Sequence, residues 1–242
     1  MRVLIGCEQF GVLREAMRKR GHDAWSCDTQ PARDGSPFHF QCDVLSMLSD
    51  LPVPGVMGWQ RLPWDLAIFH PDCTYQTNSA AWAYKDPDYD RYPGVGYHQK
   101  TKPGTLLGAA RREARERSSE FVKRLWSAPV PRIAIENPIG NLSNVLGSSQ
   151  LVQPYEFGDD ASKGTCLWLK GLLPLRPTKY IEPRWIDGRP RWANQTDSGQ
   201  NRLSPDDDRA MQRAATYPGI ADAMAEQWTA PILRRNAEGE TK

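Results

Sequence analysis

Two stretches decide the fold of this chain: residues 66–73 (LAIFHPDC) and residues 133–138 (IAIENP). Each begins with a short apolar run typical of a buried strand and continues into polar side chains. In open α/β sheets, ligands bind at the edge formed by the carboxyl ends of the strands. We therefore expect Cys73 and Glu136 to lie at such an edge, where a thiol and a carboxyl group form a nucleophile and acid pair.

Further elements follow from the spacing of apolar residues along the chain. Short apolar runs predict other strands at residues 3–5, 24–27, 38–42 and 165–169. Helical periodicity predicts helices over residues 12–20, 105–127 and 220–228, and residues 204–207 (SPDD) are a typical helix start. In the first helix we expect Arg14, Arg18 and Lys19 to share the polar face.

The alternation of strands and helices predicts an α/β fold, with a mostly parallel sheet and helices on both faces. Residues 1–180 are expected to form the core and residues 181–203 a short polar, irregular segment or loop. Residues 204–233 are expected to return to the core as helices, and residues 234–242 to form a flexible tail. Residues 85–103, rich in Tyr, Pro, Asp and Gly, are predicted to be a long loop beside Cys73.

Composition narrows the classes of protein. The chain has 242 residues, a net charge of +2 and 39% hydrophobic residues, which indicates a folded core and no overall basic charge. Its five cysteines form no CxxC pair, so we expect free thiols in a reducing cytoplasm and no metal site. We expect no signal peptide before the first strand, and no apolar run approaches the ~20 residues that span a bilayer.

The first strand leads into residues 6–11 (GCEQFG) and then a helix, without a GxGxxG motif or a P-loop. The glycines allow a tight turn and a close approach of backbone to ligand. Asp28 ends the second strand, about 20 residues later, where a carboxylate typically binds ribose hydroxyls. Asp43 follows the third strand and could accept a hydrogen bond from an adenine amino group. These positions indicate a nucleoside-bearing cofactor, S-adenosylmethionine rather than NAD or ATP, although each aspartate could also be a helix cap or turn residue.

In their order along the chain, these motifs resemble those of phage-type DNA cytosine 5-position methyltransferases. That family carries Pro-Pro-Cys after the fourth strand and Glu-Asn-Val after the fifth, which residues 71–73 (PDC) and 136–138 (ENP) match here. Residues 157–171, which include Lys163, resemble the segment with basic residues near the target base. Residues 217–224 (YPGIADAM) resemble the last motif, whose helix packs against the cofactor site. The resemblance implies a Rossmann-like class I methyltransferase fold.

The resemblance also implies an activity: transfer of a methyl group from S-adenosylmethionine to carbon 5 of cytosine in DNA, in a phage or bacterial host cell. Cys73 would add to ring carbon 6, Glu136 would act as the acid at ring nitrogen 3, and Asn137 would orient the site. Lys163 would hold the base or lower the pKa of the thiol. A base in duplex DNA would have to be flipped out of the helix to reach these groups.

The binding residues are expected as two sets. Those expected around the cofactor are Cys7, Glu8, Phe10, Gly11, Asp28, Asp43, Val44 and Pro71. Those expected to stack on or hydrogen-bond the substrate base are Trp192, Asn194, Gln195 and Asn201. Cys7, Cys27 and Cys42 are expected to behave as small buried apolar residues, and Cys7 also lies in the turn after the first strand.

Two departures from the family pattern keep alternatives open. Asp72 replaces the second proline of the motif, and a carboxylate beside the nucleophile should raise the pKa of the thiol. Asp72 could instead bind a modified donor or a metal, or reposition the loop. No large recognition domain fits the chain, so free cytidine nucleotide is a second possible substrate. A third possibility is a catalytically degenerate module that binds DNA or protein.

Overall fold

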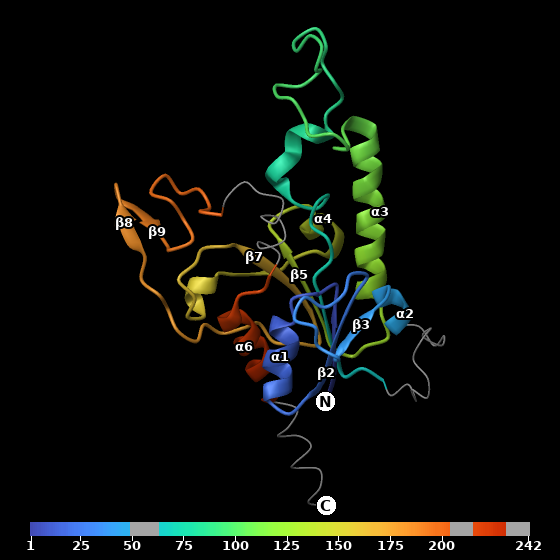
Figure 1. The fold of residues 1–242 in the computed structure, drawn as a ribbon, viewed down its shortest axis with the longest axis vertical. Helices are drawn as coiled ribbons and strands as arrows, with labels where there is room; N and C mark the ends of the chain where they lie inside the picture. The colour runs from blue at the N-terminus through green and yellow to red at the C-terminus, as the bar shows by residue number, and fades with distance from the viewer. Residues whose placement is uncertain (49–62, 204–214, 231–242) are drawn as a thin grey trace, which may run out of the picture.

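A computed structural model describes residues 1–48, 63–203 and 215–230 (Figure 1). Within them, seven strands form one sheet and two more form a separate hairpin. The strands of the large sheet are β1 (Arg2–Gly6), β2 (Asp23–Asp28), β3 (His39–Gln41), β4 (Leu66–Phe69), β5 (Ile133–Pro138), β6 (Gln150–Val152) and β7 (Thr165–Lys170). All six strands expected in this sheet are confirmed, and β6 is an addition.

The strand order in the large sheet is β3-β2-β1-β4-β5-β7-β6. Strands β1 to β5 pair in parallel, whereas β7 runs antiparallel to both β5 and β6. A seven-stranded sheet with this order and one reversed strand defines the class I methyltransferase fold, so the expected fold class is confirmed. The order reverses between β1 and β4, and ligands of doubly wound sheets bind at such a switch point.

The sheet is buried on both faces because successive side chains of a strand point to opposite sides. In β1, Val3 and Ile5 pack with α1 (Val12–Lys19) and α6 (Pro218–Gln227), which lie side by side on one face (Figure 1). Leu4 points to the other face. The helices that contribute to the core there are α2 (Val44–Leu48), α3 (Gly108–Trp126) and α4 (Leu142–Leu146).

The expected helices are confirmed with shifted ends, α3 beginning at Gly108 and α6 ending at Gln227. The helix start expected at Ser204 and the tail expected from residue 234 lie outside the described residues. One expectation about α1 is wrong: Arg14 is fully buried and does not share the polar face with Arg18. Its guanidinium is satisfied inside the protein, where it donates to Ser26 Oγ at 2.6 Å and pairs with Asp34 and Glu15.

Residues 85–103 contain no helix or strand and project beyond the start of α3, as expected of a long loop (Figure 1). The 3₁₀ helix η1 (Asn78–Tyr84) precedes them. Arginines of α3 fasten this part of the chain: Arg111 donates to the carbonyl of Thr74, and the Arg115 guanidinium lies 3.5 Å from the centroid of the Tyr84 ring. Much of the basic cluster on α3 therefore holds the segment that follows Cys73.

Residues 181–203 are more regular than expected. Strands β8 (Arg184–Ile186) and β9 (Arg189–Arg191) form an antiparallel hairpin. The turn between them uses Asp187 and Gly188, both with positive φ, as a two-residue hairpin turn of type I′ requires. A second 3₁₀ helix, η2 (Pro154–Glu156), lies between β6 and β7 in the chain. Among the described residues, no helix is long and apolar enough to span a membrane.

Candidate active site

The carboxyl ends of β4 and β5 bring the two motifs together. His70 follows β4, and its Nδ1 donates to Oε2 of Glu136 in β5 over 2.9 Å. Asn137 Nδ2 donates to the carbonyl of Pro71 over 2.8 Å. Because β4 and β5 are parallel neighbours, residues 66 positions apart in the chain meet at one edge. Asn137 thereby holds the loop that carries Cys73, and its orienting role in the reaction remains a prediction.

The carboxyl group of Glu136 is buried in this edge, with 8% of the residue exposed. Burial by itself raises the pKa of a carboxyl group. Hydrogen bonds from His70 and Thr165 and the charge of Lys163 outweigh burial, so the pKa of Glu136 lies below its ordinary value. The resting side chain is therefore a carboxylate, and a role as an acid requires a proton delivered from elsewhere.

Cys73 lies exposed in the loop after β4. Partial desolvation and the carboxylates of Asp72 and Glu136 raise the pKa of its thiol, with Lys163 acting in the opposite direction. The raised thiol pKa expected from Asp72 is thus confirmed. Asp72 also shapes the loop, because its Oδ1 accepts hydrogen bonds from the backbone N–H and the hydroxyl of Thr74, at 3.0 and 2.7 Å. These contacts fit the loop-positioning alternative, and the role of Asp72 remains a prediction.

Lys163 precedes β7, and its charge acts on both Glu136 and Cys73. Its ammonium donates to the carbonyl of Ala215 at 3.4 Å and lies 5.9 Å from the centroid of the Tyr217 ring. The residue thus sits between the expected active site and the start of α6. All five residues expected to be catalytic (Cys73, Glu136, Asn137, Lys163 and Asp72) meet in one region, and their roles remain predictions.

Gln76 is a positioning residue that the sequence did not reveal. It is fully buried, and its carbonyl accepts from the Asn141 backbone N–H at 2.7 Å. Its side chain donates to Ser119 Oγ in α3 at 3.2 Å and accepts from Asn141 Nδ2 at 3.1 Å. Gln76 therefore ties the loop after Cys73 to both α3 and the loop after β5. No local pattern distinguishes it from an exposed glutamine, so only its partners reveal this role.

The turn after β1 is built for close packing. Gly11 starts α1 with φ of 76°, and a Cβ there would lie 2.2 Å from the Arg14 guanidinium. Glu8 is 6% exposed, and its Oε1 accepts from the backbone N–H of Leu13 at 3.1 Å. Burial raises the pKa of Glu8, an effect that His70, the Leu13 N–H and Arg14 only partly offset. The side chain of Glu8 is therefore turned into the protein.

Carboxylates gather around this turn. The pKa of Cys7, a residue with φ of 59°, is raised to about 12 by burial and by the charges of Asp28, Asp43 and Asp72. Asp28 and Asp43 also make the turn and helix-cap contacts that were the alternative to cofactor binding. Asp28 Oδ1 accepts from the Gln30 N–H at 2.9 Å in a turn, and Asp43 Oδ1 caps α2 through the Leu45 N–H at 2.9 Å.

The remaining residues expected around the cofactor lie close to this edge. Val44 and Pro71 are buried, and Phe10 is half-buried with the Arg33 guanidinium 5.3 Å from the centroid of its ring. Cofactor binding by the whole set remains a prediction. Nearby, the Sγ atoms of Cys27 and Cys42 are 3.6 Å apart, and all five cysteines are free.

The four residues expected to contact the substrate all have partners inside the protein. Trp192 is buried and stacks on Tyr155 with 4.1 Å between ring centroids. Asn194 forms two hydrogen bonds with the backbone of Ser162, next to Lys163. Gln195 accepts from the Trp192 N–H at 3.2 Å, and Asn201 accepts from the Leu203 N–H at 2.8 Å. These contacts brace the segment after the hairpin, and base recognition by it remains a prediction.

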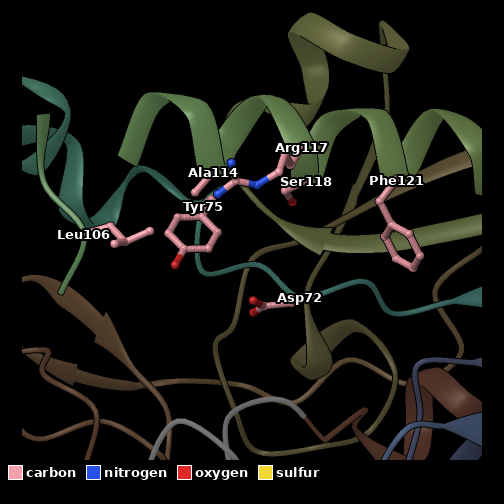
Figure 2. A pocket seen from close by; sticks show the side chains of 7 residues that line it. All are labelled: Asp72, Tyr75, Leu106, Ala114, Arg117, Ser118 and Phe121. Carbon is pink, nitrogen blue, oxygen red and sulfur yellow. The ribbon is translucent and has the colours of Figure 1, made fainter. Parts of the chain in front are cut away.

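A pocket of about 340 Å³ lies between α3 and the loop that carries Cys73 (Figure 2). Figure 2 shows Asp72 and Tyr75 facing Arg117 and Phe121 across it. The other lining residues are Leu106, Ala114 and Ser118. The pocket therefore combines a carboxylate, a guanidinium and two aromatic rings, and the carboxylate is that of Asp72, the residue before Cys73. Among the described residues, no three His, Cys, Asp or Glu side chains gather as metal ligands.

Comparison with known proteins adds little to what the strand order shows about the fold. No protein-family model and no curated protein match the chain. One similar solved structure is that of a prophage-encoded E. coli protein described provisionally as a DNA modification methyltransferase. It has 14% sequence identity and a TM-score of 0.37, and the match covers 70% of this chain and 46% of that one. The chain thus spans less than half of that protein, and the fold class rests on the sheet topology.

Proposed function

We propose that the protein transfers a methyl group from S-adenosylmethionine to carbon 5 of cytosine in DNA, through a covalent bond to Cys73. One observation carries the proposal. The thiol of Cys73 and the carboxyl group of Glu136 lie at the ends of adjacent parallel strands, tied together by the His70–Glu136 and Asn137–Pro71 hydrogen bonds. The edge that holds them belongs to a methyltransferase fold, at the place where such sheets bind ligands.

Cys73 supplies the nucleophile. Carbon 5 of cytosine reacts poorly with electrophiles, but addition of a thiolate to carbon 6 gives carbon 5 enamine character. Because the pKa of the Cys73 thiol is raised, the thiolate is the minor form before substrate binds. A positive charge near the sulfur favours the thiolate, and Lys163 supplies that charge. The exposed position of Cys73 leaves the sulfur accessible to a flipped base.

Glu136 acts on the opposite side of the ring. A proton or a hydrogen bond at ring nitrogen 3 draws electrons from carbon 6 and makes thiolate addition feasible. The addition forms the S–C6 bond and shifts the C5–C6 π electrons to carbon 5. After methyl transfer, a base removes the proton from carbon 5, the S–C6 bond breaks and nitrogen 3 returns its proton. Asn137 keeps the two motifs in register through its bond to Pro71.

The residues after β1, β2 and β3 fit the proposed cofactor. Asp28, Asp43 and Asp72 place negative charge around Cys7. Carboxylates accept hydrogen bonds from ribose hydroxyls and amino groups, favour a sulfonium cation and disfavour phosphate. The positive φ of Gly11 provides a tight turn without the backbone cradle of a phosphate site. When bound here, S-adenosylmethionine would supply an electrophilic methyl group.

A second candidate function keeps Cys73 but changes the donor or the acceptor. The pocket between α3 and the loop that carries Cys73 favours it, because Asp72, Arg117 and the ring of Tyr75 line this space and are groups of the kind that contact charged and planar ligands. A catalytically degenerate binding module is the third candidate, and it predicts that Cys73 is dispensable.

Covalent capture tests the proposal. A DNA duplex with 5-fluorocytosine is incubated with S-adenosylmethionine and the protein, because fluorine at carbon 5 blocks the final elimination and leaves the base bonded to sulfur. We expect an adduct that survives denaturing electrophoresis. It should be lost in Cys73→Ser and kept in Cys166→Ala, a control that alters a buried cysteine of β7. An adduct that persists in Cys73→Ser would overturn the proposal, and an adduct formed only with free fluorocytidine nucleotide would favour the second candidate.

A further inference from the structure

Three ionisable side chains from three different strand ends form a buried row at the sheet edge. Glu136 lies in β5, His70 follows β4 and Glu8 follows β1. Nδ1 of His70 bonds to Glu136 at 2.9 Å, and the backbone N–H of His70 donates at 3.0 Å to the carbonyl of Gly6, two residues before Glu8. Of the three, only Glu136 belongs to the mechanism above. His70 was unassigned, and Glu8 was expected only near the cofactor.

Two buried atoms in this row lack partners. Among the described residues, neither Oε2 of Glu8 nor Nε2 of His70 has a hydrogen-bond partner. An unpaired buried polar atom destabilises the folded state, so such atoms in a folded protein call for an explanation. One is a carboxyl oxygen and the other an imidazole nitrogen, so they are chemically complementary as donor and acceptor when the carboxyl group is protonated.

The resting protonation states match that arrangement. Burial disfavours the charged form of Glu8 and raises its pKa, so Glu8 tends to keep its proton. Glu136 is a carboxylate, and it accepts the Nδ1 proton of His70. His70 with its proton on Nδ1 leaves Nε2 bare. A proton held at the Glu8 end of this row would supply the one that the acid of the proposed reaction lacks.

We propose that Glu8 and His70 form a proton relay that protonates Glu136 when a cytosine binds. This inference rests on the proposed function and names the source of the proton that the function requires. Glu8 and His70 are positioning residues, since neither touches the substrate. The relay includes one contact that the resting structure does not make, a hydrogen bond from Glu8 Oε2 to His70 Nε2.

The proton transfers along this row balance. Glu8 gives its proton to His70 Nε2, His70 gives its Nδ1 proton to Glu136, and Glu136 gives a proton to ring nitrogen 3 as the sulfur adds to carbon 6. The row ends as two carboxylates and a neutral imidazole of the other tautomer, and the ring carries the extra proton. When the S–C6 bond breaks after methyl transfer, nitrogen 3 returns the proton along the same path. No outside acid is consumed.

The groups that face this row determine how it responds to pH. Around Glu136 these are His70, Lys163 and the hydroxyl of Thr165. Around Glu8 they are His70, Arg14, Asp34 and the Leu13 N–H. Arg14 and Lys163 are basic residues and favour ionised carboxylates, so the burial of Glu8 is what keeps the proton at its end.

Carboxyl NMR titration of the full-length protein, with ¹³C-labelled glutamate and no substrate, tests the row directly. We expect Glu8 to titrate above, and Glu136 below, the range of ordinary glutamates. His70→Asn places an amide donor near the position of Nδ1 but removes the imidazole, so the Glu8 titration should shift. His98→Gln, an exposed control in the 85–103 loop, should leave both titrations unchanged. A Glu8 titration in the ordinary range, or one unaffected by His70→Asn, would overturn the relay.

The capture reaction with fluorocytosine duplex supplies the kinetic test. Glu8→Gln keeps the oxygen that caps Leu13 but carries no transferable proton, so we expect adduct formation to slow by about 10²–10⁴-fold at neutral pH. The loss should shrink at low pH, where solvent protonates Glu136. Adduct formation should slow similarly in His70→Asn. If His70 only oriented Glu136, the amide donor of this variant would restore the rate of the parent protein. Glu116→Gln, which alters an exposed residue of α3, serves as the control.

Each result bears on a separate claim. Equal capture rates for Glu8→Gln and the parent protein at every pH would overturn the relay. Absence of any adduct with the parent protein would count against the proposed function, and the NMR titration would still decide whether the row holds its proton at Glu8.

Discussion

At the scale of single residues, the carboxylate of Asp72 sets the reactivity of the thiol beside it. Burial is the main cause of the raised pKa of the Cys73 thiol and the charge of Asp72 adds to it, so removing that charge should lower the pKa and increase the thiolate fraction at neutral pH. We expect iodoacetamide to alkylate Cys73 faster in Asp72→Asn than in the parent protein at pH 7, with the difference vanishing at high pH. Mass spectrometry of the Cys73 peptide measures the rates.

Asp90→Asn is the matched control, since it removes an exposed carboxylate from the 85–103 loop. Equal alkylation rates in Asp72→Asn and Asp90→Asn would show that the loop turn with Thr74, and not charge, is the contribution of Asp72.

The site residues could be predicted where chemistry and position coincide in the sequence. Cys73 and Glu136 stand out because each reactive side chain directly follows an apolar run. The environment of each residue was not predictable, because the partners of Glu136 lie on other strands. Arg14 shows the same limit: its helical position indicates a polar face, but Ser26 and Asp34 make its burial possible.

At the scale of elements, the contact between the two site loops depends on the absence of a side chain at Gly140. The residue pairs with Thr77 in an isolated antiparallel bridge, and a Cβ would lie 2.0 Å from the carbonyl oxygen of Gln76. Gly140→Ala must therefore push the loops apart, and we expect it to lower the free energy of unfolding by about 1–3 kcal/mol. Urea denaturation followed by tryptophan fluorescence measures this loss.

Gly164→Ala is the control, because a Cβ there would lie no closer than 3.3 Å to the ends of the Gln153 and Ile139 side chains. A loss in Gly140→Ala no larger than in Gly164→Ala would contradict the close approach of the two loops.

The longer elements could be predicted because their apolar spacing is regular, whereas the short ones could not. Helix α2 and helix α4 have five residues each, too few for a periodic signal. The β8–β9 hairpin did carry a local signal, the Asp187-Gly188 pair typical of a type I′ turn, between residues rich in Trp and Arg. That segment was expected to be irregular because its composition is polar and it does not fit the alternation of strands and helices.

At the scale of the whole molecule, the buried Glu8 couples stability to pH. Its pKa in the folded protein lies above the value of about 4.3 expected in an unfolded chain. The folded state then binds more protons than the unfolded state, and stability falls as the pH rises from the unfolded to the folded pKa. Glu8→Gln removes this loss, so we expect the variant to gain stability relative to the parent as the pH rises.

Thermal unfolding of the two proteins between pH 4 and pH 8 measures the gain, with Glu116→Gln as a control whose difference from the parent should stay constant. A stability difference between Glu8→Gln and the parent that does not change with pH would contradict a raised pKa for Glu8.

The fold class could be predicted because alternating strands and helices leave few arrangements of a parallel sheet. The reversed strand β7 and its neighbour β6 were beyond such a pattern, since pairing direction depends on contacts between distant segments. The arginines of α3 show the same limit on a larger scale. Their clustering is visible in the sequence, but their use in holding residues 74–86 follows from where α3 packs.

The most direct test of the central claim is mass spectrometry of the nucleosides from DNA treated with the purified protein and S-adenosylmethionine with a ¹³C-labelled methyl group. Parallel reactions use duplex DNA, single-stranded DNA and free cytidine nucleotides, each with the Cys73→Ala variant beside the parent protein. The account predicts labelled 5-methylcytosine in DNA that depends on Cys73. DNA without labelled 5-methylcytosine, or label that appears equally with Cys73→Ala, would contradict it.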